Sequence, residues 1–403
     1  MKKKILIVTE CFYPEEFKIN EVAIEWQKRG YEVAVLTSFP TYPFGKIFDG
    51  YKNSWYKKDS WNGITIYRVR AVIGYQKSLV KKLFKYFSFM FLGSILSLKV
   101  GKKYDYIFGF NVGSLTGMLP AVILKKFYKK PVTLWVQDVW PDSVYAYGFK
   151  KTKLLEFVLD GFVRFIYNHT SGIAISGEGF HTRILPYVSE NKKIVYAPNW
   201  ADSMNDNYDI FSFSKESKKH FTFAGNIGTV QNLDNVIKAF GCLEKEYLNK
   251  AQLNIIGDGS HLEELKKLVI KENIANIVFW GRKPREDIKK YFQASDFLIV
   301  SLIDMPIFTL TVPAKLQTYI SVKKPILAIL EGDTAHIVEK NNLGFCAKPN
   351  DLDGIKDIFL KSICLNEKEK KAFTVNCSIL SEAVYNKEKI IDKLLVLTLG
   401  KEK

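Results

Sequence analysis

The sequence predicts an α/β protein built from two doubly wound, Rossmann-like domains. Short apolar runs alternate with stretches of helical spacing over residues 1–200, which is typical of a parallel sheet with crossover helices. A polar stretch over residues 201–219 indicates a linker, and the same alternation starts again over residues 220–380. The remaining residues, 381–403, are expected to form a C-terminal helix that packs back toward the N-terminal domain.

Composition narrows the range of functions. The chain has 403 residues, of which 47% are hydrophobic, enough for the cores of two domains. It carries 59 Lys and Arg against 42 Asp and Glu, and the net charge of +17 favours nucleic acid, phosphorylated substrates or an anionic membrane as partner. The five cysteines show no metal-binding or disulfide spacing, which indicates a reducing compartment. The apolar run after Lys4 is too short for a signal peptide, so we expect a cytoplasmic location.

The N-terminal elements follow a βαβ order. A strand is predicted over 4–9, a helix over 19–29 and a second strand over 31–37. The turn after the first strand has no Gly-x-Gly-x-x-Gly, which argues against a dinucleotide-binding domain. Further strands are predicted over 106–110, 132–136, 172–176 and 193–196. Asp138 directly follows one of them, which places a carboxylate at the ligand edge of the sheet unless it caps a helix or turn.

A basic, Phe-rich segment spans residues 77–103. No acidic residue occurs between Ser60 and Tyr104, and the apolar run Leu83–Leu98 contains Lys85. This run is shorter than the roughly 20 residues that a helix needs to span a bilayer. A basic, aromatic-rich helix suits peripheral membrane contact, and a core helix with a solvated basic end is the alternative. Nucleic-acid binding is not supported, because no nucleic-acid motif accompanies the basic residues.

Glycine or a small polar residue follows each of the first strands predicted in the second domain. These strands are expected over 221–224, 253–256, 277–280 and 297–300. The carboxyl ends of parallel strands form the ligand edge of an open sheet. Gly225 and Gly228 are therefore expected to let backbone N–H groups approach a diphosphate, which Arg282 and Lys315 would neutralise.

The stretch Phe308–Leu330 follows the last of these strands. It predicts a turn, a helix that opens at about Pro313, and another strand over 325–330. Lys315 and Tyr319 are four residues apart, so they share one face of this helix. The N-terminus of a helix that follows a strand binds anions, which makes Lys315 a candidate phosphate ligand. An ordinary surface lysine is the alternative.

Several local strings are spread over nearly the whole chain. They are Phe12–Asn20, Phe39–Gly45, Trp135–Asp142, Pro198–Trp200, Gly225–Gly228 and Val312–Lys315. Together with the two αβ domains, these strings resemble the retaining glycosyltransferases of family 4, which have the GT-B fold. The resemblance is greatest to the bacterial surface-polysaccharide branch that includes fucosamine transferases of O-antigen and capsule loci.

The resemblance implies two domains that face a central cleft, with a UDP-sugar donor on the second and the acceptor on the first. The base would lie near Trp280–Arg282. The residues implied for the donor are Gly225, Asn226, Gly228, Asp258, Arg282, Lys315 and Thr318. The residues implied for the acceptor side are Glu15, Asn20 and Gln137, and those implied to assist the acceptor hydroxyl as catalytic groups are Glu16 and Asp138.

No metal cofactor is implied, because cationic side chains and a helix N-terminus would stabilise the departing diphosphate. The Asp-x-Asp formed by Asp351 and Asp353 is interpreted as a helix cap. The chain also departs from the family pattern. Leu310 and Thr318 stand where many relatives carry two glutamates, and Gln137 stands where many carry a histidine. Thr318 would therefore offer the ribose only a hydroxyl, and the cations would hold more of the donor.

The resemblance predicts an enzyme, a retaining glycosyltransferase of hexosyltransferase type. It would transfer an N-acetylated amino or deoxyamino sugar from a UDP-sugar to a polyprenyl-diphosphate-linked glycan in capsule or O-antigen biosynthesis. The protein would be peripheral at the inner face of the cell membrane, in contact through residues 77–103. The alternatives are a degenerate, non-catalytic partner of an active transferase and a GT-B sugar-nucleotide epimerase.

Overall fold

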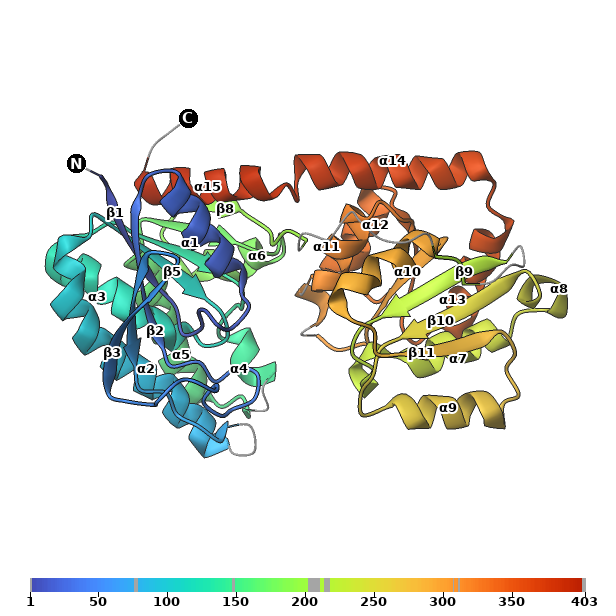
Figure 1. The fold of residues 1–403 in the computed structure, drawn as a ribbon, viewed down its shortest axis with the longest axis horizontal. Coiled ribbons are helices and arrows are strands. Elements are labelled where there is room, and N and C mark those ends of the chain that lie inside the picture. Colours follow the sequence, from blue (N-terminus) through green and yellow to red (C-terminus); the bar gives the residue numbers. More distant parts are fainter. Residues whose placement is uncertain are drawn as a thin grey trace. The chain divides into compact units, whose positions relative to one another are not determined.

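The computed structural model describes residues 2–75, 79–146, 149–201, 211–213, 218–306, 308–310 and 312–400 (Figure 1). The chain forms two compact units: Met1–Pro198 with Glu388–Lys403, and Asn199–Lys387. The linker predicted over residues 201–219 lies mostly outside the described residues, and its last residue begins a strand of the second unit.

The first unit is built on an eight-stranded sheet. Its strands lie in the order β3-β4-β2-β1-β5-β6-β7-β8, and every neighbouring pair is parallel except β3 with β4. The strands are β1 (Lys4–Val8), β2 (Glu32–Ser38), β3 (Tyr56–Trp61), β4 (Ile64–Val69), β5 (Tyr106–Asn111), β6 (Val132–Val136), β7 (Gly172–Ile175) and β8 (Ile194–Tyr196). The doubly wound, parallel architecture predicted for this domain is confirmed.

The hairpin of β3 and β4 was not predicted from the sequence. Its two strands are joined by Asn62 and Gly63, whose φ angles are 48° and 78°. Asn-Gly is the commonest signal for a two-residue hairpin turn, because both positions require positive φ. The signal was therefore present, but β3 is a polar edge strand, YKKDSW, without an apolar pattern that would reveal it.

Helices connect these strands and cover the sheet. They are α1 (Lys18–Lys28), α2 (Leu79–Val100), α3 (Leu119–Tyr128), α4 (Asp142–Ala146), α5 (Lys153–Asn168) and α6 (Phe180–Ile184), with short 3-10 turns η2 (Gly101–Lys103), η3 (Leu115–Met118) and η4 (Leu185–Tyr187). The C-terminal helix α15 (Lys387–Leu399) also belongs to this unit and lies beside α1 (Figure 1).

Specific contacts attach α15 to the first unit. Arg29, at the end of α1, forms ion pairs with Glu388 and Asp392 at 3.0 Å and 2.5 Å. Leu397 fills the space beside Gly172 in β7, where a Cβ atom would lie only 2.7 Å from the Leu397 side chain. The last helix therefore begins at Lys387 and not at 381, because the preceding residues continue a helix of the second unit.

Helix α2 contains the basic, Phe-rich segment. The stretch Leu83–Lys103 is long and apolar enough to cross a membrane by length and composition. One face of α2 nevertheless packs into the unit, since Phe89 and Ser97 are buried and Gly93 lies against Pro120 of α3. The opposite face carries exposed apolar side chains, among them Phe84 and Phe91. The helix is therefore a crossover element of the sheet with one face toward the core and one toward solvent.

The second unit is built on a six-stranded, fully parallel sheet in the order β11-β10-β9-β12-β13-β14. The strands are β9 (Lys219–Ala224), β10 (Ala251–Ile256), β11 (Ile277–Gly281), β12 (Phe297–Ser301), β13 (Ile326–Ile329) and β14 (Gly344–Ala347). The helices are α7 (Leu233–Gly241), α8 (Lys245–Leu248), α9 (Leu262–Lys271), α10 (Ile288–Ala294), α11 (Ala314–Ser321), α12 (Asp333–Lys340), α13 (Leu352–Cys364) and α14 (Glu367–Ala383).

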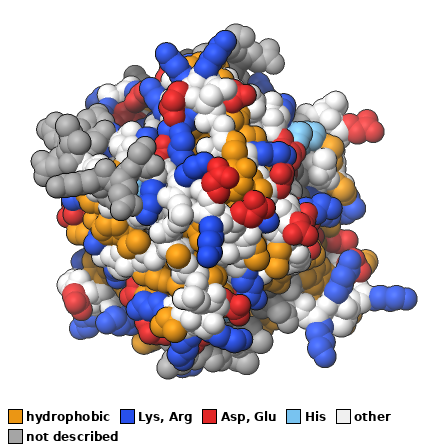
Figure 2. Space-filling view, turned by 90° about the vertical axis from the view of Figure 1, so that its right-hand side faces the viewer, with side chains coloured by type: hydrophobic (Ala, Val, Ile, Leu, Met, Phe, Trp, Pro, Cys, Tyr) orange, Lys and Arg blue, Asp and Glu red, His pale blue; other side chains and the backbone are white. Residues whose placement is uncertain are grey.

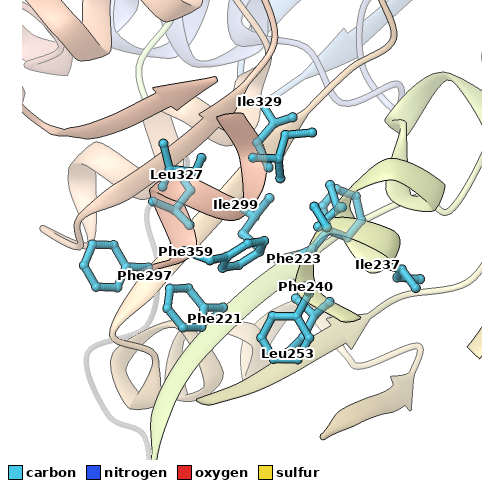
Figure 3. Packing of buried hydrophobic residues seen from close by; sticks show 14 of the residues in the cluster. Phe221, Phe223, Ile237, Phe240, Leu253, Phe297, Ile299, Leu327, Ile329 and Phe359 are labelled. Atoms are coloured by element: carbon cyan, nitrogen blue, oxygen red, sulfur yellow. The ribbon is translucent and has the colours of Figure 1, made fainter. Parts of the chain in front are cut away.

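Aromatic side chains fill the core on one face of this sheet (Figure 3). Phe221 stacks on Phe297 with ring centroids 5.5 Å apart, and Phe359 of α13 meets the edge of Phe221 at 5.0 Å. Alternate residues of the same strands, such as Leu298, join a second core on the opposite face. A parallel strand with both faces covered reads as a continuous apolar run, which is why the sequence predicted these strands well.

The stretch Phe308–Leu330 folds as predicted. A short 3-10 turn, η7 (Phe308–Leu310), follows β12, Pro313 is the N-cap of α11, and β13 comes next. Lys315 is the second residue of α11, and Tyr319 on the same face is buried, with its hydroxyl donating to the Ile299 carbonyl at 3.3 Å.

Basic and acidic side chains are interspersed on the face drawn in Figure 2.

The ends of β9 and β10 approach so closely that only glycine fits between them. A Cβ atom on Gly257, whose φ is 142°, would lie 1.8 Å from the carbonyl oxygen of Gly225. We predict that Gly257→Ala destabilises the protein by more than about 1 kcal/mol, because both the backbone angle and the contact become strained. Denaturant unfolding measures this change.

Gly161→Ala is the matched control, since Gly161 lies in α5 and a Cβ atom there meets nothing within 4 Å. This control should stabilise the helix by roughly 0.5–1 kcal/mol. An unfolding curve for Gly257→Ala that coincides with that of the unaltered protein would contradict the assigned contact.

Candidate functional site

A pocket opens at the carboxyl ends of β9, β10 and β11. Its volume is about 830 Å³, and both apolar and polar residues line it. The polar and charged lining residues are Asn226, Asp258, Arg282, Lys283 and Arg285. Four residues that the sequence predicted for one site, Gly225, Asn226, Asp258 and Arg282, are thus brought together by the fold. Cations outnumber carboxylates in this lining, so the pocket suits an anion.

The loop after β9 is fixed by backbone hydrogen bonds. The Gly225 N–H donates to the Ile256 carbonyl at 2.9 Å, and the Gly228 N–H donates to the side-chain oxygen of Gln231, also at 2.9 Å. Both glycines therefore use their own N–H groups inside the protein. Within the described residues, Asn226 is the loop position whose N–H has no acceptor, so it is the donor available to a ligand.

Lys315 lies directly behind this loop. A Cβ atom on Gly225 would be 2.8 Å from its ammonium nitrogen, so the glycine makes room for the lysine. The nitrogen also lies 3.6 Å from the ring centroid of Phe223, a cation–π contact. Burial lowers the pKa of Lys315 to about 7. No carboxylate among the described residues pairs with it, and an anion in the neighbouring pocket would stabilise its charged form.

Thr318 and Trp280 are placed differently from the other predicted donor residues. The Thr318 hydroxyl donates to the Ala314 carbonyl one turn back, at 3.1 Å, and Thr318 is not part of the pocket lining. The indole N–H of Trp280 donates to Asn254 at 3.0 Å, and its ring packs among aromatic side chains of the core. Leu310 lies in η7, but its side chain is outside the described part of the structure.

In the first unit, Glu15 ties two loops together. Its carboxylate accepts backbone N–H groups from Phe12 at 3.2 Å, Thr41 at 2.8 Å and Tyr42 at 2.6 Å. The side-chain amide of Asn20 donates to the Glu15 carbonyl at 2.7 Å. These two predicted acceptor-side residues therefore hold the loops after β1 and β2 in place. Burial raises the pKa of Glu15, and the three backbone bonds lower it.

Asp138 occupies the end of β6, as predicted. It is partly buried, and one carboxylate oxygen accepts the Gly113 N–H at 2.6 Å. Burial raises the pKa of Asp138, while this hydrogen bond lowers it. Gln137 precedes it and donates its own N–H to the Asn111 carbonyl. Glu16 is exposed on the loop after β1. Because β1, β5 and β6 are neighbours, all these loops lie at one edge of the sheet.

Two charged residues of this edge were missed by sequence reasoning. Glu10 directly follows β1, is 4% exposed, and has a carboxylate oxygen without a hydrogen-bond partner beside Gly117. Burial raises its pKa to about 7, against the opposing effect of the Lys85 charge. Burial would lower the pKa of Lys85, but the negative charge of Glu10 raises it above its ordinary value. Lys85 in an otherwise apolar run was the available signal.

The second unit also holds cations that were not predicted. Lys283 and Arg285 follow Arg282 on the connection from β11 to α10 and line the same pocket. The run Gly281-Arg-Lys-Pro-Arg285 was visible in the sequence, but only Arg282 was selected from it. The interpretation of Asp351 as a helix cap is confirmed, because its side chain accepts the Gly354 N–H at 2.9 Å at the start of α13.

The two α/β units, each built on a mainly or wholly parallel sheet, have the architecture of the GT-B fold. Solved structures agree in fold: sucrose-phosphate synthase from Thermosynechococcus elongatus is 13% identical, with 99% of each chain covered and a TM-score of 0.67. Anabaena HepE in complex with UDP is 12% identical, with 98% of this chain and 99% of that chain covered and a TM-score of 0.65.

Residues 205–376, which belong to the second unit, match the family model "Glycosyl transferases group 1", so this part of the chain is a domain of that family. WbjE of Pseudomonas aeruginosa, named as a glycosyltransferase, is 27% identical over 59% of this chain, and the match spans 62% of WbjE. WcaI of Escherichia coli (strain K12), named as a colanic acid biosynthesis glycosyl transferase, is 24% identical over 74% of this chain and 76% of its own length.

We predict that Glu10→Gln stabilises the protein more at about pH 8 than at about pH 5. The pKa of Glu10 is about 7 in the folded state and 4.5 ordinarily, so the folded state holds the proton more tightly. The stability that this residue contributes is present below pH 4.5 and is lost as the pH rises through 7. The glutamine variant escapes this loss, which is about 3 kcal/mol for a pKa raised from 4.5 to about 7.

The measurement is thermal unfolding of both proteins at the two pH values. The charged neighbours that act on Glu10, Lys85 and Glu15, stay in place in the variant. Glu190→Gln is the control, because this glutamate is exposed. Equal effects of Glu10→Gln at both pH values would show that the group does not titrate in this window.

Proposed function

We propose that the protein is a glycosyltransferase that transfers a sugar from a UDP-sugar, with retention of the anomeric configuration, to a lipid-linked glycan in surface-polysaccharide biosynthesis. The observation that carries this proposal is Lys315, which is partly buried and has no carboxylate partner among the described residues, behind a pocket lined by Arg282, Lys283 and Arg285. Such a pocket suits the diphosphate of a nucleotide sugar, and cations placed there stabilise the charge that develops on the leaving group.

The relatives support a nucleotide-sugar donor. The solved Anabaena structure holds UDP, and a trehalose-6-phosphate protein from Escherichia coli, which has the same fold, holds a UDP-2-fluoro glucose. WbjE is named as a glycosyltransferase and WcaI as a glycosyl transferase of colanic acid biosynthesis, which supports a glycan product. The N-acetylated amino or deoxyamino sugar and the hexosyltransferase type belong to this proposal through the family resemblance described above.

In the proposed reaction the second unit binds the donor. The diphosphate lies at the Asn226 N–H, near Arg282, with Lys315 supplying charge from behind Gly225. Positioning and leaving-group stabilisation provide most of the rate, and no metal ion is needed in this scheme. Asp138, in the first unit, has a raised pKa and lies at the edge proposed for the acceptor, where it would orient the acceptor hydroxyl. Glu16 shares this edge and is a second candidate for that role.

The polyprenyl-diphosphate-linked acceptor belongs to the same proposal. Helix α2 displays exposed Phe84, Phe87 and Phe91 on a segment without acidic residues, which supports peripheral contact with an anionic membrane. A lipid-linked acceptor resides in that membrane, so the enzyme would act at its cytoplasmic face. Capsule and O-antigen are the two polysaccharides to which the resemblance points.

A non-catalytic partner protein is the second candidate, and the observation that favours it is the loss of paired carboxylates. Leu310 and Thr318 replace both glutamates that many relatives carry, and the Thr318 hydroxyl is already hydrogen-bonded to Ala314. A degenerate transferase should bind UDP weakly or not at all. The sugar-nucleotide epimerase would bind UDP but would have no use for a membrane-associated acceptor, so a transfer assay separates it from the transferase.

We predict that Lys315→Met weakens UDP binding about 10- to 100-fold, since a charge-assisted contact contributes roughly 1.5–3 kcal/mol. Wild-type affinity should also fall as the pH rises above 7, because the pKa of Lys315 is about 7 and only the protonated amine attracts the diphosphate. The fall should approach tenfold per pH unit. Isothermal titration with UDP at several pH values measures both effects.

Lys315→Arg keeps the charge at every pH, so its UDP affinity should no longer depend on pH in this range. Lys267→Met, at an exposed position of α9, is the matched control and should bind UDP normally. Normal binding by Lys315→Met would remove Lys315 from the phosphate site.

A further inference from the structure

We propose that the protein docks on an anionic lipid surface through one edge of its first unit, the edge at which the strands of the eight-stranded sheet end. This inference deepens the membrane contact in the proposed function and rests on it for the identity of the acceptor. The membrane would then be contacted by six exposed side chains at this edge and not by the whole length of α2. We term these side chains the apolar rim: Phe44, Ile73, Phe84, Phe87, Leu154 and Phe157.

The topology places these residues together. Helix α2 crosses from β4 to β5, and α5 crosses from β6 to β7, and all four strands run in parallel. A crossover helix starts at the carboxyl edge of the sheet and returns to the opposite edge. The first turns of α2 and α5 therefore lie at the carboxyl edge. The loops after β2 and β4, which carry Phe44 and Ile73, lie at the same edge.

Large exposed apolar side chains on α5 are confined to its first two turns, at this edge. Leu154 and Phe157 there are 75% and 78% exposed. Farther along the same helix, the exposed positions are Gly161, Arg164 and Asn168, none of which is a large apolar residue. A crossover helix that only packs on its sheet carries polar side chains on its outward face. The apolar start of α5 therefore has no partner within the described part of the chain.

Contacts connect the parts of the rim. The Gly74 N–H donates to the Gly45 carbonyl at 2.7 Å, which joins the loops that carry Ile73 and Phe44. The ring of Tyr86, in α2, lies 6.5 Å from the ring of Trp140, in the loop between β6 and α4, and the Tyr86 carbonyl accepts the Thr116 hydroxyl at 3.2 Å. Both α2 and α5 pack against η3, which holds Thr116.

Charge favours a lipid surface as the occupant. Lys81 stands in the first turn of α2, and Lys150 and Lys153 precede Leu154, and all three are exposed. Lysines beside exposed phenylalanines suit the boundary between anionic headgroups and acyl chains, where each basic residue adds attraction. The chain as a whole carries a charge of +17, which draws it to such a surface.

The same edge carries Asp138 and the loop that Glu15 fixes. Docking through the rim therefore brings the proposed acceptor groups to the bilayer surface. The headgroup of a lipid-linked glycan would reach them without leaving the membrane. Contact along α2 alone would not fix this orientation, because a single helix lying on a surface allows the unit to roll about its axis.

The test is flotation with vesicles of phosphatidylethanolamine and phosphatidylglycerol, using single serine substitutions in matched pairs. Phe84 and Phe91 lie on the same face of α2, two turns apart, and are 64% and 61% exposed. Phe157 at the rim is compared with Phe127, which is 62% exposed at the far end of α3. We expect Phe84→Ser and Phe157→Ser each to lower vesicle binding about three- to tenfold, and Phe91→Ser and Phe127→Ser to change it less than twofold.

Equal losses for Phe84→Ser and Phe91→Ser, with no loss for Phe157→Ser, would overturn the rim and restore contact along α2. Failure of the wild-type protein to float would overturn the proposal, as would self-association through the rim in place of lipid binding. Vesicles of phosphatidylcholine alone should bind more weakly if the lysines contribute. The UDP titration uses no lipid, so it fails or succeeds independently of this result.

Discussion

The second unit depends on a partly buried ammonium group, that of Lys315, which no described carboxylate neutralises. Lys315 is packed between Gly225 and the Phe223 ring, where burial lowers its pKa to about 7. Taking a charge out of water without a partner is unfavourable for the folded state, so this arrangement is rarely kept for stability alone. The glycine after β9 is needed because any side chain there would displace the lysine. Lys315 reaches the strand ends because α11 begins, after its Pro313 cap, close to the end of β12.

The first unit has the opposite electrostatic character at the corresponding edge. Glu10 and Glu15 are buried and Asp138 is partly buried, and burial raises the pKa of all three carboxyl groups. Lys85 is the cation that acts on the first two. Lys85 directly follows Phe84 in α2, and the two side chains have different surroundings: Phe84 is exposed to solvent, and Lys85 lies near the carboxylates of Glu10 and Glu15. Anything that moves the second turn of α2, which holds Phe84 and Lys85, therefore changes the environment of Glu10. Under the proposed function, docking and the acceptor groups are coupled through this one turn.

The sequence was informative where burial forces a simple pattern. The parallel strands have both faces covered and appear as apolar runs, so all the strands predicted in both units were found, as was the Pro313 helix start. It was less informative where a residue's role depends on a distant contact. Strand β3 (Tyr56–Trp61), the outer strand of the hairpin with β4, is polar because it lies at the edge of the sheet. Glu10 looked like the end of an apolar run, and its neighbours Lys85 and Gly117 are separated from it by many residues. Gly225 and Gly228 were correctly placed at strand ends, but their N–H groups are used within the protein, which no local pattern could reveal.

The absence of glutamates at positions 310 and 318 affects the charge of Lys315. A glutamate at position 310 or 318 would add negative charge to the turn and helix that carry Lys315. In a site of low dielectric, a nearby carboxylate would raise the pKa of the lysine and also compete with a diphosphate for it. Leucine and threonine leave the cation uncompensated, and Lys283 and Arg285 add further positive charge at the pocket. Under the proposed function, the chain therefore lacks a carboxylate contact to the ribose of the sugar nucleotide but has a larger positive charge near its phosphates. Such a site would discriminate less by the ribose and more by the charge and reach of the diphosphate.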